Sequence, residues 1–449
     1  MAVFIPTDEN DLSKVDASPT KAFFVDIITK DILVDEAILD LVDNCIDGAK
    51  RLRPGENPDF SGLQVDIVAN GDQFRIGDNC GGIPLEIARK YAFKFGRAAN
   101  FVPTDRSVGQ FGVGMKRALF KMAKNFSVKS IEREHSFEIE VDVEQWASDD
   151  INWDFDVKNL VDGPHPADKT GTTLEIKVLD PEVADTLAET TFEVALGRGI
   201  RVRHQDAMSR GLSIRLNGVT LLSTSLRLKV GEVTWPMRKE FIDPIDSSTL
   251  TTRIFAGVAD SDRAKAGWYV FCNGRCILEA DQSETTGWNS VIEGGGIRTP
   301  KYHNQFARFR GFAFLDSIDA SILPWNTTKT GLDPETAAYR LLIRRLITAT
   351  RPVIDFLNAL DGEIDLAESE KVLTAGLERA PSIALSAIQP RDALLFKLPP
   401  KKGPPMSWIR YRWLTKEAKV LKAELGATTY PELGEKTFKF AYDNLIEDL

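Results

Sequence analysis

The chain has 449 residues, enough for two to four domains at roughly 100–200 residues each. Hydrophobic residues make up 43% and charged residues 27%, a balance typical of folded globular proteins that argues against long disordered segments. The net charge of −10 means that the molecule as a whole does not attract nucleic acid, so such binding would need a local basic patch.

The first half of the chain mixes helices and strands. Residues 1–20 are polar and are expected to form an N-terminal arm, and the apolar spacing predicts helices at 22–51, with at most one short break, and at 115–123. Alternating apolar and polar residues predict five strands, at 63–68, 73–76, 126–131, 137–143 and 172–178. This order is typical of an α+β sandwich in which helices cover one face of a sheet.

A second block begins near residue 181. It contains strands, such as those expected at 212–216 and 268–271, and then a long amphipathic helix at 335–360. Between the block's later strands, Asn273–Gly274 predicts a tight hairpin turn. The proline-rich segment 397–405 has the composition of a linker, and the chain after it is predicted to be mainly helical.

The first long helix carries a polar stripe. At ~100° per residue, Asp40, Asn44 and Asp47 fall on one side, with Glu36 one turn earlier, and the apolar residues fall opposite. Such an oxygen-rich ridge suits Mg²⁺, which prefers oxygen ligands and retains several waters. On its own the stripe is better explained as a solvated helix face, so its meaning depends on the rest of the sequence.

Three glycine-bearing segments follow in order. In GDNCGGIP (77–84), Asp78 ends a strand, and the glycines after it let the backbone approach a flat ligand whose exocyclic amine the carboxylate could bind. In GQFGVGMKRALFKMA (109–123), glycines precede a helix N-terminus, which attracts phosphate. In KTGTTLEI (169–176), a Gly–Thr pair opens a strand. Each segment alone is weak evidence, because a hairpin turn or a dinucleotide-binding fold also explains such glycines.

In this order and spacing, the helix and the three segments resemble the N, G1, G2 and GT boxes of the GHKL ATPases, the superfamily of gyrase, heat-shock chaperones, histidine kinases and MutL. The resemblance covers about residues 20–180 and extends more loosely to 360, and it is closest in style to Microrchidia (MORC) proteins, MutL and the chaperones. It implies a Bergerat-type α/β sandwich, a transducer-like α/β domain and a mostly helical C-terminal region, at 21–180, 181–360 and 361–449.

The resemblance also implies roles for single residues. Asn44 would coordinate Mg²⁺, and Asp78 would accept a hydrogen bond from the adenine amine of ATP with support from Thr172. The adenine would be lined by Gly82 and Ile83. The phosphates would be wrapped by the glycine loop, namely Gly109, Gln110, Phe111, Gly112, Val113, Gly114, Met115 and Lys116. Asp47 is a further candidate pocket residue, and residues 95–106 would form a mobile lid.

Two residues depart from the family pattern. Asp40 stands where the family usually carries the glutamate that polarises the attacking water, and its carboxylate reaches one methylene less, so hydrolysis could be slowed. Glu36 is a less favoured substitute for this base. Cys80 replaces the first glycine of the G1 box, which affects the expected shape of that loop but leaves Asp78 in place.

The polar loop 324–333 lies before the long helix of the second block. In the family, a lysine of such a loop reaches the γ-phosphate and reports hydrolysis to the rest of the molecule. Lys329 is predicted to have this catalytic role, and Arg340 is its nearest rival. The alternative is a helix-capping loop with a solvated lysine.

These features predict an ATPase that converts ATP and water to ADP and phosphate slowly, with Mg²⁺, and whose nucleotide state controls homodimerisation. ATP would close a clamp on DNA or a client protein, and the MORC-like style favours DNA, in chromosome maintenance or defence against foreign DNA. The alternative is a nucleotide-regulated scaffold with little hydrolysis, which Asp40 motivates. A protein kinase acting in trans is a minor alternative. An autophosphorylating histidine kinase is rejected because no histidine precedes His135.

Metal-binding cysteines and membrane segments are not expected. Cys272 and Cys276 are three residues apart, unlike the usual zinc spacing, and four cysteines are too few for a disulfide framework. The N-terminus has no basic-then-apolar signal, and no apolar run approaches the ~18 residues of a membrane span. We therefore expect a cytoplasmic protein.

Overall fold

The computed structural model describes residues 20–23, 25, 27, 29–30, 32–94, 105–109, 114–149, 151–292, 296–390, 409 and 412–446. The chain divides into two compact units, residues 1–399 and 400–449. Most of the N-terminal arm, most of the lid at 95–106, the residues 110–113 and the linker at 397–405 therefore lie outside the described residues. The fold is α+β, as predicted, and no helix among the described residues is long and apolar enough to cross a membrane.

The larger unit contains an eight-stranded mixed sheet in the order β5-β4-β3-β6-β2-β1-β7-β8. All neighbours are antiparallel except β1 and β7, which run parallel. The strands are β1 (Gln64–Asn70), β2 (Gln73–Asp78), β3 (Ala123–Ile131), β4 (His135–Asp142), β5 (Val157–Asp162), β6 (Gly171–Leu179), β7 (Ser213–Leu216) and β8 (Val219–Thr220). The five strands predicted in the first half are all present. The strand expected at 212–216 is also present, but it pairs with β1 rather than with the strands that follow it.

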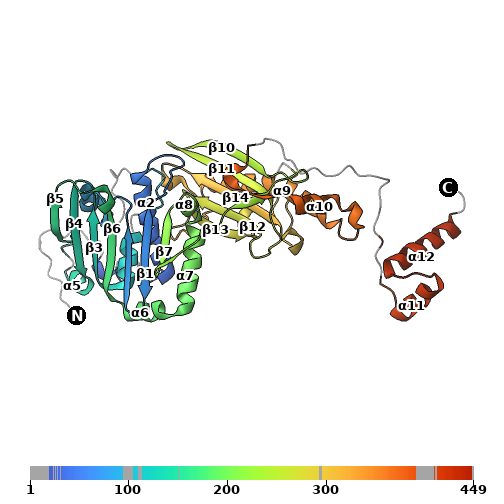
Figure 1. Cartoon of the computed structure of the whole chain (residues 1–449), viewed down its shortest axis with the longest axis horizontal. Helices are drawn as coiled ribbons and strands as arrows, with labels where there is room; N and C mark the ends of the chain where they lie inside the picture. Colours follow the sequence, from blue (N-terminus) through green and yellow to red (C-terminus); the bar gives the residue numbers. More distant parts are fainter. Residues whose placement is uncertain are drawn as a thin grey trace, which may run out of the picture. The chain divides into compact units, whose positions relative to one another are not determined.

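Helices pack on this sheet around one hydrophobic core, because their apolar residues and those of the strands form a single buried cluster. These helices are α2 (Val34–Leu52), α3 (Leu85–Ile87), η2 (Ala88–Ala92), α4 (Gly114–Met122), α5 (Val143–Ala147), α6 (Pro181–Ala188), α7 (Thr190–Arg203) and α8 (Gln205–Ser209), and the short helix α1 (Lys21–Phe23) precedes them. Helices α2 and α4 pack against each other. Helix α7 contacts α2 and also strand β13 (Arg275–Asp281) of the second sheet (Figure 1).

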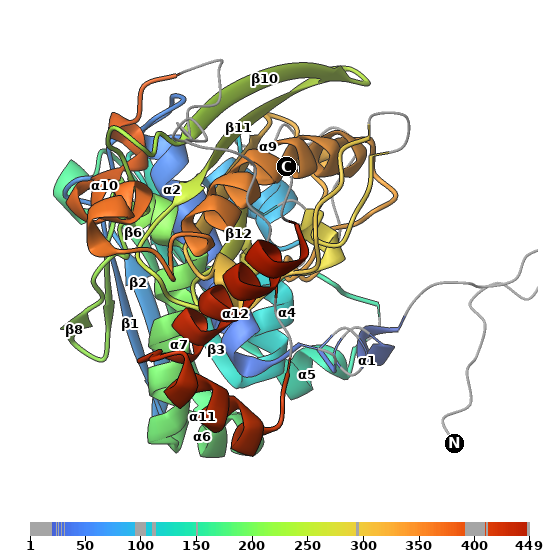
Figure 2. The same cartoon turned by 90° about the vertical axis from the view of Figure 1, so that its right-hand side faces the viewer.

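The second sheet has five strands in the order β10-β11-β14-β12-β13. Its strands are β10 (Met237–Ile245), β11 (Ser248–Val258), β12 (Gly267–Cys272), β13 (Arg275–Asp281) and β14 (Phe309–Asp316). The predicted hairpin turn is confirmed, because Asn273 and Gly274 join β12 to β13 with φ of 47° and 82°. The long helix α9 (Ala337–Asp361) packs along this sheet (Figure 2). Between them, Trp268 Nε1 donates to Thr350 Oγ1 at 3.0 Å.

Short elements complete both units. The strands β9 (Arg227–Lys229) and β15 (Ser382–Ala384) form a two-stranded sheet, and α10 (Val372–Arg379) packs against α9. Single 3₁₀ turns occur at η3 (Ala167–Lys169), η4 (Glu284–Thr286), η5 (Asn304–Phe306), η6 (Ala320–Ile322), η7 (Glu368–Glu370) and η8 (Leu385–Ala387). The smaller unit holds the helices α11 (Thr415–Glu424) and α12 (Tyr430–Leu445), so its described part is helical, as predicted.

Candidate nucleotide site

A pocket lies between helix α2 and the first sheet. Helix α2 contributes Asn44 and Gly48, strands β2 and β6 contribute Asp78 and Thr172, and helix α4 contributes Met115. The remaining lining residues include Leu41, Cys45, Arg51, Ile76, Cys80, Gly82, Ile83, Val128 and Leu174. The structure thus brings together residues predicted from four separate segments of the sequence.

Asp78 is fixed at the base of this pocket. Its Oδ1 accepts hydrogen bonds from the backbone N–H groups of Cys80 at 2.7 Å and Thr172 at 3.3 Å. Burial raises the pKa of Asp78 above its ordinary value, although these donors oppose the shift. Thr172 therefore contacts Asp78 through its backbone N–H. A side chain at Gly171 would overlap the Asp78 carbonyl oxygen, so β6 can approach this closely only with glycine there.

The loop after Asp78 is shaped by two left-handed glycines. Gly81 and Gly82 have φ of 91° and 75°, and a Cβ on Gly82 would overlap the carbonyl oxygen of Ile131 on β3. The next residue, Ile83, donates its backbone N–H to Ser130 Oγ at 2.7 Å. The loop is thereby pinned to β3. Ser130 is a supporting residue that the sequence analysis did not identify.

The polar stripe of α2 is buried. Residues Asp40 and Asp47 are only 5% and 6% exposed, so the explanation of the stripe as a solvated helix face is wrong. Asp47 accepts hydrogen bonds from the backbone N–H groups of Val108 and Gly109, each at 2.8 Å. It therefore supports the start of the glycine loop. The amide nitrogen of Asn44 is buried without a hydrogen-bond partner among the described residues, so it is open to a ligand.

The two described ends of the glycine loop lie against this stripe. A Cβ on Gly109 would lie 3.1 Å from an oxygen of Asp47, and a Cβ on Gly114 would lie 3.1 Å from an oxygen of Asp40. Glycine is therefore the residue that fits both positions without a shift of the carboxylates. The predicted phosphate contacts between these ends, namely Gln110, Phe111, Gly112 and Val113, lie outside the described residues.

Lys116 follows in the first turns of α4. Its amine donates to the backbone carbonyls of Ala92 and Lys94, at 3.1 and 2.6 Å, so it ties α4 to the end of η2. Burial lowers the pKa of Lys116 to about 8.

Asp40 is held between two cations. Arg117 Nη2 lies 2.9 Å from Oδ2 of Asp40, and Lys329 Nζ lies 3.0 Å from Oδ1. Burial alone would lower the pKa of Lys329, but the neighbouring carboxylates raise it above its ordinary value. The rival candidate, Arg340, instead donates to the backbone carbonyl of Glu335 at 2.6 Å. Of the two cations proposed from the sequence, Lys329 is therefore the one that contacts the stripe.

Residues 32–161 match a family model described as histidine kinase-, DNA gyrase B-, and HSP90-like ATPase. These residues form a GHKL ATPase domain. The match includes α2, Asp78 and both described ends of the glycine loop, but it ends before Thr172 and Lys329. A search of curated proteins gave no match for the chain. The family indicates nucleotide binding for the GHKL domain.

A further buried carboxylate in the GHKL domain, Asp43, escaped the sequence analysis. Its side chain accepts from Lys329 at 2.7 Å and Arg275 at 2.9 Å, and His204 Nε2 lies 2.8 Å from it. Burial alone would raise the pKa of Asp43, but Arg275 and Lys329 lower it well below its ordinary range. Burial, with Arg275 beside it, lowers the pKa of His204 to about 4, so this imidazole is neutral at pH 7.

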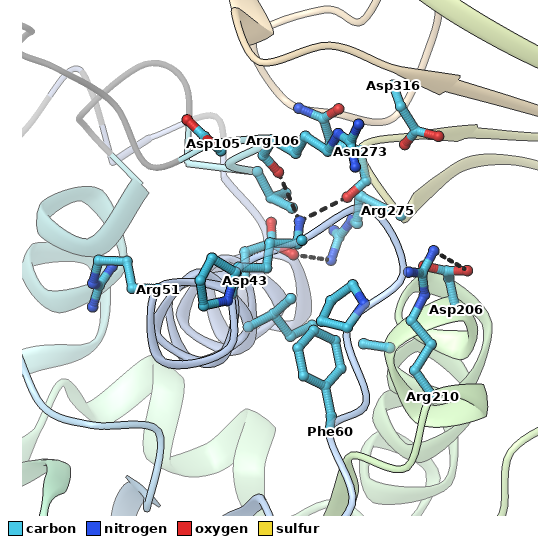
Figure 3. A pocket seen from close by; sticks show the side chains of 18 of the residues that line it. Asp43, Arg51, Phe60, Asp105, Arg106, Asp206, Arg210, Asn273, Arg275 and Asp316 are labelled. Carbon is cyan, nitrogen blue, oxygen red and sulfur yellow. Dashed lines mark hydrogen bonds and ion pairs between the residues drawn. The ribbon is translucent and has the colours of Figure 1, made fainter.

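A larger cavity, of about 710 Å³, lies where the GHKL domain meets the second sheet. Figure 3 shows Arg275 reaching from the start of β13 to Asp43, on one side of this cavity. Lys50 Nζ donates to the carbonyls of Arg106 and Asn273, each at 2.8 Å, and so joins α2 to the turn before β13. Glu36, the less favoured base, lies 3.7 Å from Arg275.

Proposed function

We propose that the protein binds ATP between α2 and the first sheet, hydrolyses it slowly, and uses the nucleotide to control the pairing of two copies into a clamp. The observation that carries this proposal is the ion pair of Lys329 with Asp40, of which only Asp40 lies in the segment that matches the GHKL ATPases. A lysine from a loop beyond the matched segment lies on the acidic stripe of the nucleotide pocket. Such a contact can transmit the nucleotide state to the second sheet.

The pocket residues fit the parts of ATP. Asp78, fixed by two backbone N–H groups, would accept from the adenine amine beside Gly82 and Ile83. Asn44 would supply an oxygen ligand to Mg²⁺, which would neutralise phosphate charge. The amide nitrogen of Asn44, which has no partner among the described residues, is a hydrogen-bond donor and would suit an oxygen of the phosphates. Gly109, Gly114 and the loop between them would enclose the phosphates.

Hydrolysis would depend on Asp40 as the general base. Its carboxylate would take the proton of the water that attacks the γ-phosphate. Both of its oxygens are engaged, one by Arg117 and one by Lys329. The carboxylate can therefore accept a proton from water only if one oxygen contacts the water and a cation together, or if one of the two cations moves away. The γ-phosphate, an anion with several charges, would draw Lys329 toward itself and free Oδ1. This requirement, together with the short side chain of Asp40, agrees with slow turnover.

The partner held by the clamp would be DNA, as the MORC-like style of the motifs favours, or a client protein. Of the basic residues that could attract DNA, Arg345 is already paired with Asp243 through two contacts of 2.6 and 2.7 Å. Arg344 remains exposed on α9. A DNA-binding surface would therefore need basic residues other than Arg344 and Arg345.

The second candidate is an ATP-dependent scaffold with little hydrolysis. The double engagement of Asp40 favours it, because a base with both oxygens paired is not ready to accept a proton. Magnesium-dependent phosphate release that disappears in Asn44→Ala would exclude the scaffold.

Molecular size in solution tests the clamp. The purified protein is measured alone, with a non-hydrolysable ATP analogue, and with the analogue and duplex DNA. We expect the analogue to convert monomers to dimers and DNA to remain bound at raised salt only when the analogue is present. An unchanged size with a bound analogue would favour the scaffold.

A further inference from the structure

Lys329 is shared by two carboxylates of α2. Its amine lies 2.7 Å from Asp43 Oδ2 and 3.0 Å from Asp40 Oδ1, and all three side chains are at least nine-tenths buried. A lysine amine is a point charge on a flexible stem, so its position depends on the groups that surround it. Asp43 is therefore as important as Asp40 for where this amine lies.

Asp43 is itself held by the second sheet. Arg275 Nη1 lies 2.9 Å from its Oδ1, and His204 Nε2 lies 2.8 Å from the same oxygen. Arg275 is fixed in turn because it follows the tight turn at Asn273, whose amide nitrogen donates to the carbonyls of Ser107 and Ser317 at 3.1 Å each. The position of Asp43 is thus tied to that of β13.

The cluster stays paired when Lys329 leaves. Asp40 keeps Arg117 at 2.9 Å, and Asp43 keeps Arg275 at 2.9 Å. Breaking a buried ion pair is costly mainly because a charge is left without a partner, and here neither carboxylate would be. The arrangement therefore lets a competing anion withdraw Lys329 at a modest energetic cost.

We propose that Asp43, held by Arg275, is a positioning residue that stores Lys329 over Asp40 in the nucleotide-free protein and releases it to the γ-phosphate. The release step rests on the proposed function, whereas the storage step concerns the nucleotide-free protein alone. Asp43 then connects the second sheet to Asp40, the proposed general base, because a shift of β13 would move Arg275, Asp43 and Lys329 together.

The storage step is tested by the reactivity of Lys329 toward an amine-acylating reagent, measured on its peptide by mass spectrometry without nucleotide. The test variant is Asp43→Asn/Arg275→Met, which removes one charge of each sign. The matched control is Asp243→Asn/Arg345→Met, which removes a partly buried ion pair between β10 and α9. We expect the test variant to raise the acylation rate of Lys329 about tenfold and the control to leave it unchanged.

Turnover and affinity give the second measurement. We expect the test variant to lower kcat about tenfold or more while the affinity for a non-hydrolysable analogue stays within about threefold, because positioning is lost and binding is not. If the double variant does not fold, Arg275→Lys replaces it, because it keeps the positive charge but loses the planar guanidinium. We expect Arg275→Lys to change acylation and kcat in the same directions but by less. Unchanged acylation of Lys329 in a folded variant would overturn the inference, and so would unchanged kcat. Absence of turnover in the unaltered protein would instead overturn the proposed hydrolysis, and acylation alone would then decide.

Discussion

Lys329 places its amine 3.0 Å from Oδ1 of Asp40, although 289 positions separate the two residues in the sequence. Asp40 lies in the GHKL domain, and Lys329 lies in the loop before α9, which packs on the second sheet. The pair therefore joins the acidic stripe of the nucleotide pocket to the part of the chain that would respond to the nucleotide. The predictions below test the pocket first and this connection last.

Asn44→Ala tests the magnesium site. We expect the affinity for ATP in excess Mg²⁺ to fall about tenfold or more, because one oxygen ligand of the metal is lost. The affinity in excess EDTA should be weak for both proteins and nearly equal. Isothermal titration with a non-hydrolysable analogue measures both values. The exposed Asn304→Ala is the control, and an equal loss with and without Mg²⁺ would argue against metal coordination by Asn44.

Asp78→Asn tests adenine recognition. The amide keeps the shape of the carboxylate but offers only one oxygen, which already accepts two backbone N–H groups in the structure. We expect ATP to bind with a loss of about 1–3 kcal/mol, the usual effect of an unmade buried hydrogen bond. Binding of an adenosine-free triphosphate should be unaffected. Equal loss for both ligands would show that Asp78 acts on the fold instead of on adenine.

Gly82→Ala tests the close approach of the G1 loop to β3. Gly82 and Gly62 both have positive φ, at 75° and 84°, but only at Gly82 would a Cβ overlap backbone atoms, whereas nothing lies within 4 Å of one at Gly62. The strained backbone costs about 1–2 kcal/mol at each site. We expect Gly82→Ala to lower the free energy of unfolding by clearly more than Gly62→Ala. Chemical denaturation measures the free energy of unfolding of both variants. Equal losses would mean that the loop shifts to accommodate the added methyl group without cost.

Lys116→Met tests a buried charge through pH. The pKa of Lys116 is lowered to about 8 in the folded protein, against about 10.4 for an unfolded lysine. Between these values the unfolded chain binds more protons, so rising pH favours folding through this residue. Below about pH 8 the buried charged amine of Lys116 lowers the free energy of unfolding by its full amount, and above about pH 10.4 this effect is absent.

We therefore expect the stability of the unaltered protein to rise relative to Lys116→Met between pH 8 and about pH 10, by at most about 1.4 kcal/mol per pH unit. Urea denaturation at several pH values gives the difference. The exposed Lys124→Met is the control, and it should show a flat difference. A flat difference for Lys116→Met would mean that its amine titrates normally.

Much of the nucleotide pocket could be predicted because its signals are local. Helical spacing alone brings Asp40, Asn44 and Asp47 to one side of α2. The pair Gly81–Gly82 predicts the close-approaching loop after Asp78, and both glycines are left-handed in the structure. Strand β5 was not predicted, because all of its residues are exposed and it lacks the alternation of a half-buried strand. Strand β7 was assigned to the second block, because its parallel pairing with β1 spans the chain between them.

The cluster around Asp43 could not be predicted in the same way. Asp43 and Arg275 are 232 positions apart, and no periodicity or spacing connects them. The available signals were a further acid on α2, three residues after Asp40 and four before Asp47, and an arginine directly after the Asn–Gly turn. Neither signal identifies its partner, because ion pairs between distant segments are set by tertiary packing.

The central claim is that Lys329 couples the nucleotide to dimerisation, and Lys329→Met tests it by molecular size in solution with a non-hydrolysable ATP analogue. The account predicts that the unaltered protein and the control Arg340→Met dimerise with the analogue, whereas Lys329→Met binds the analogue with similar affinity and stays in its nucleotide-free state. Dimerisation of Lys329→Met at the same analogue concentration as the unaltered protein would contradict the claim.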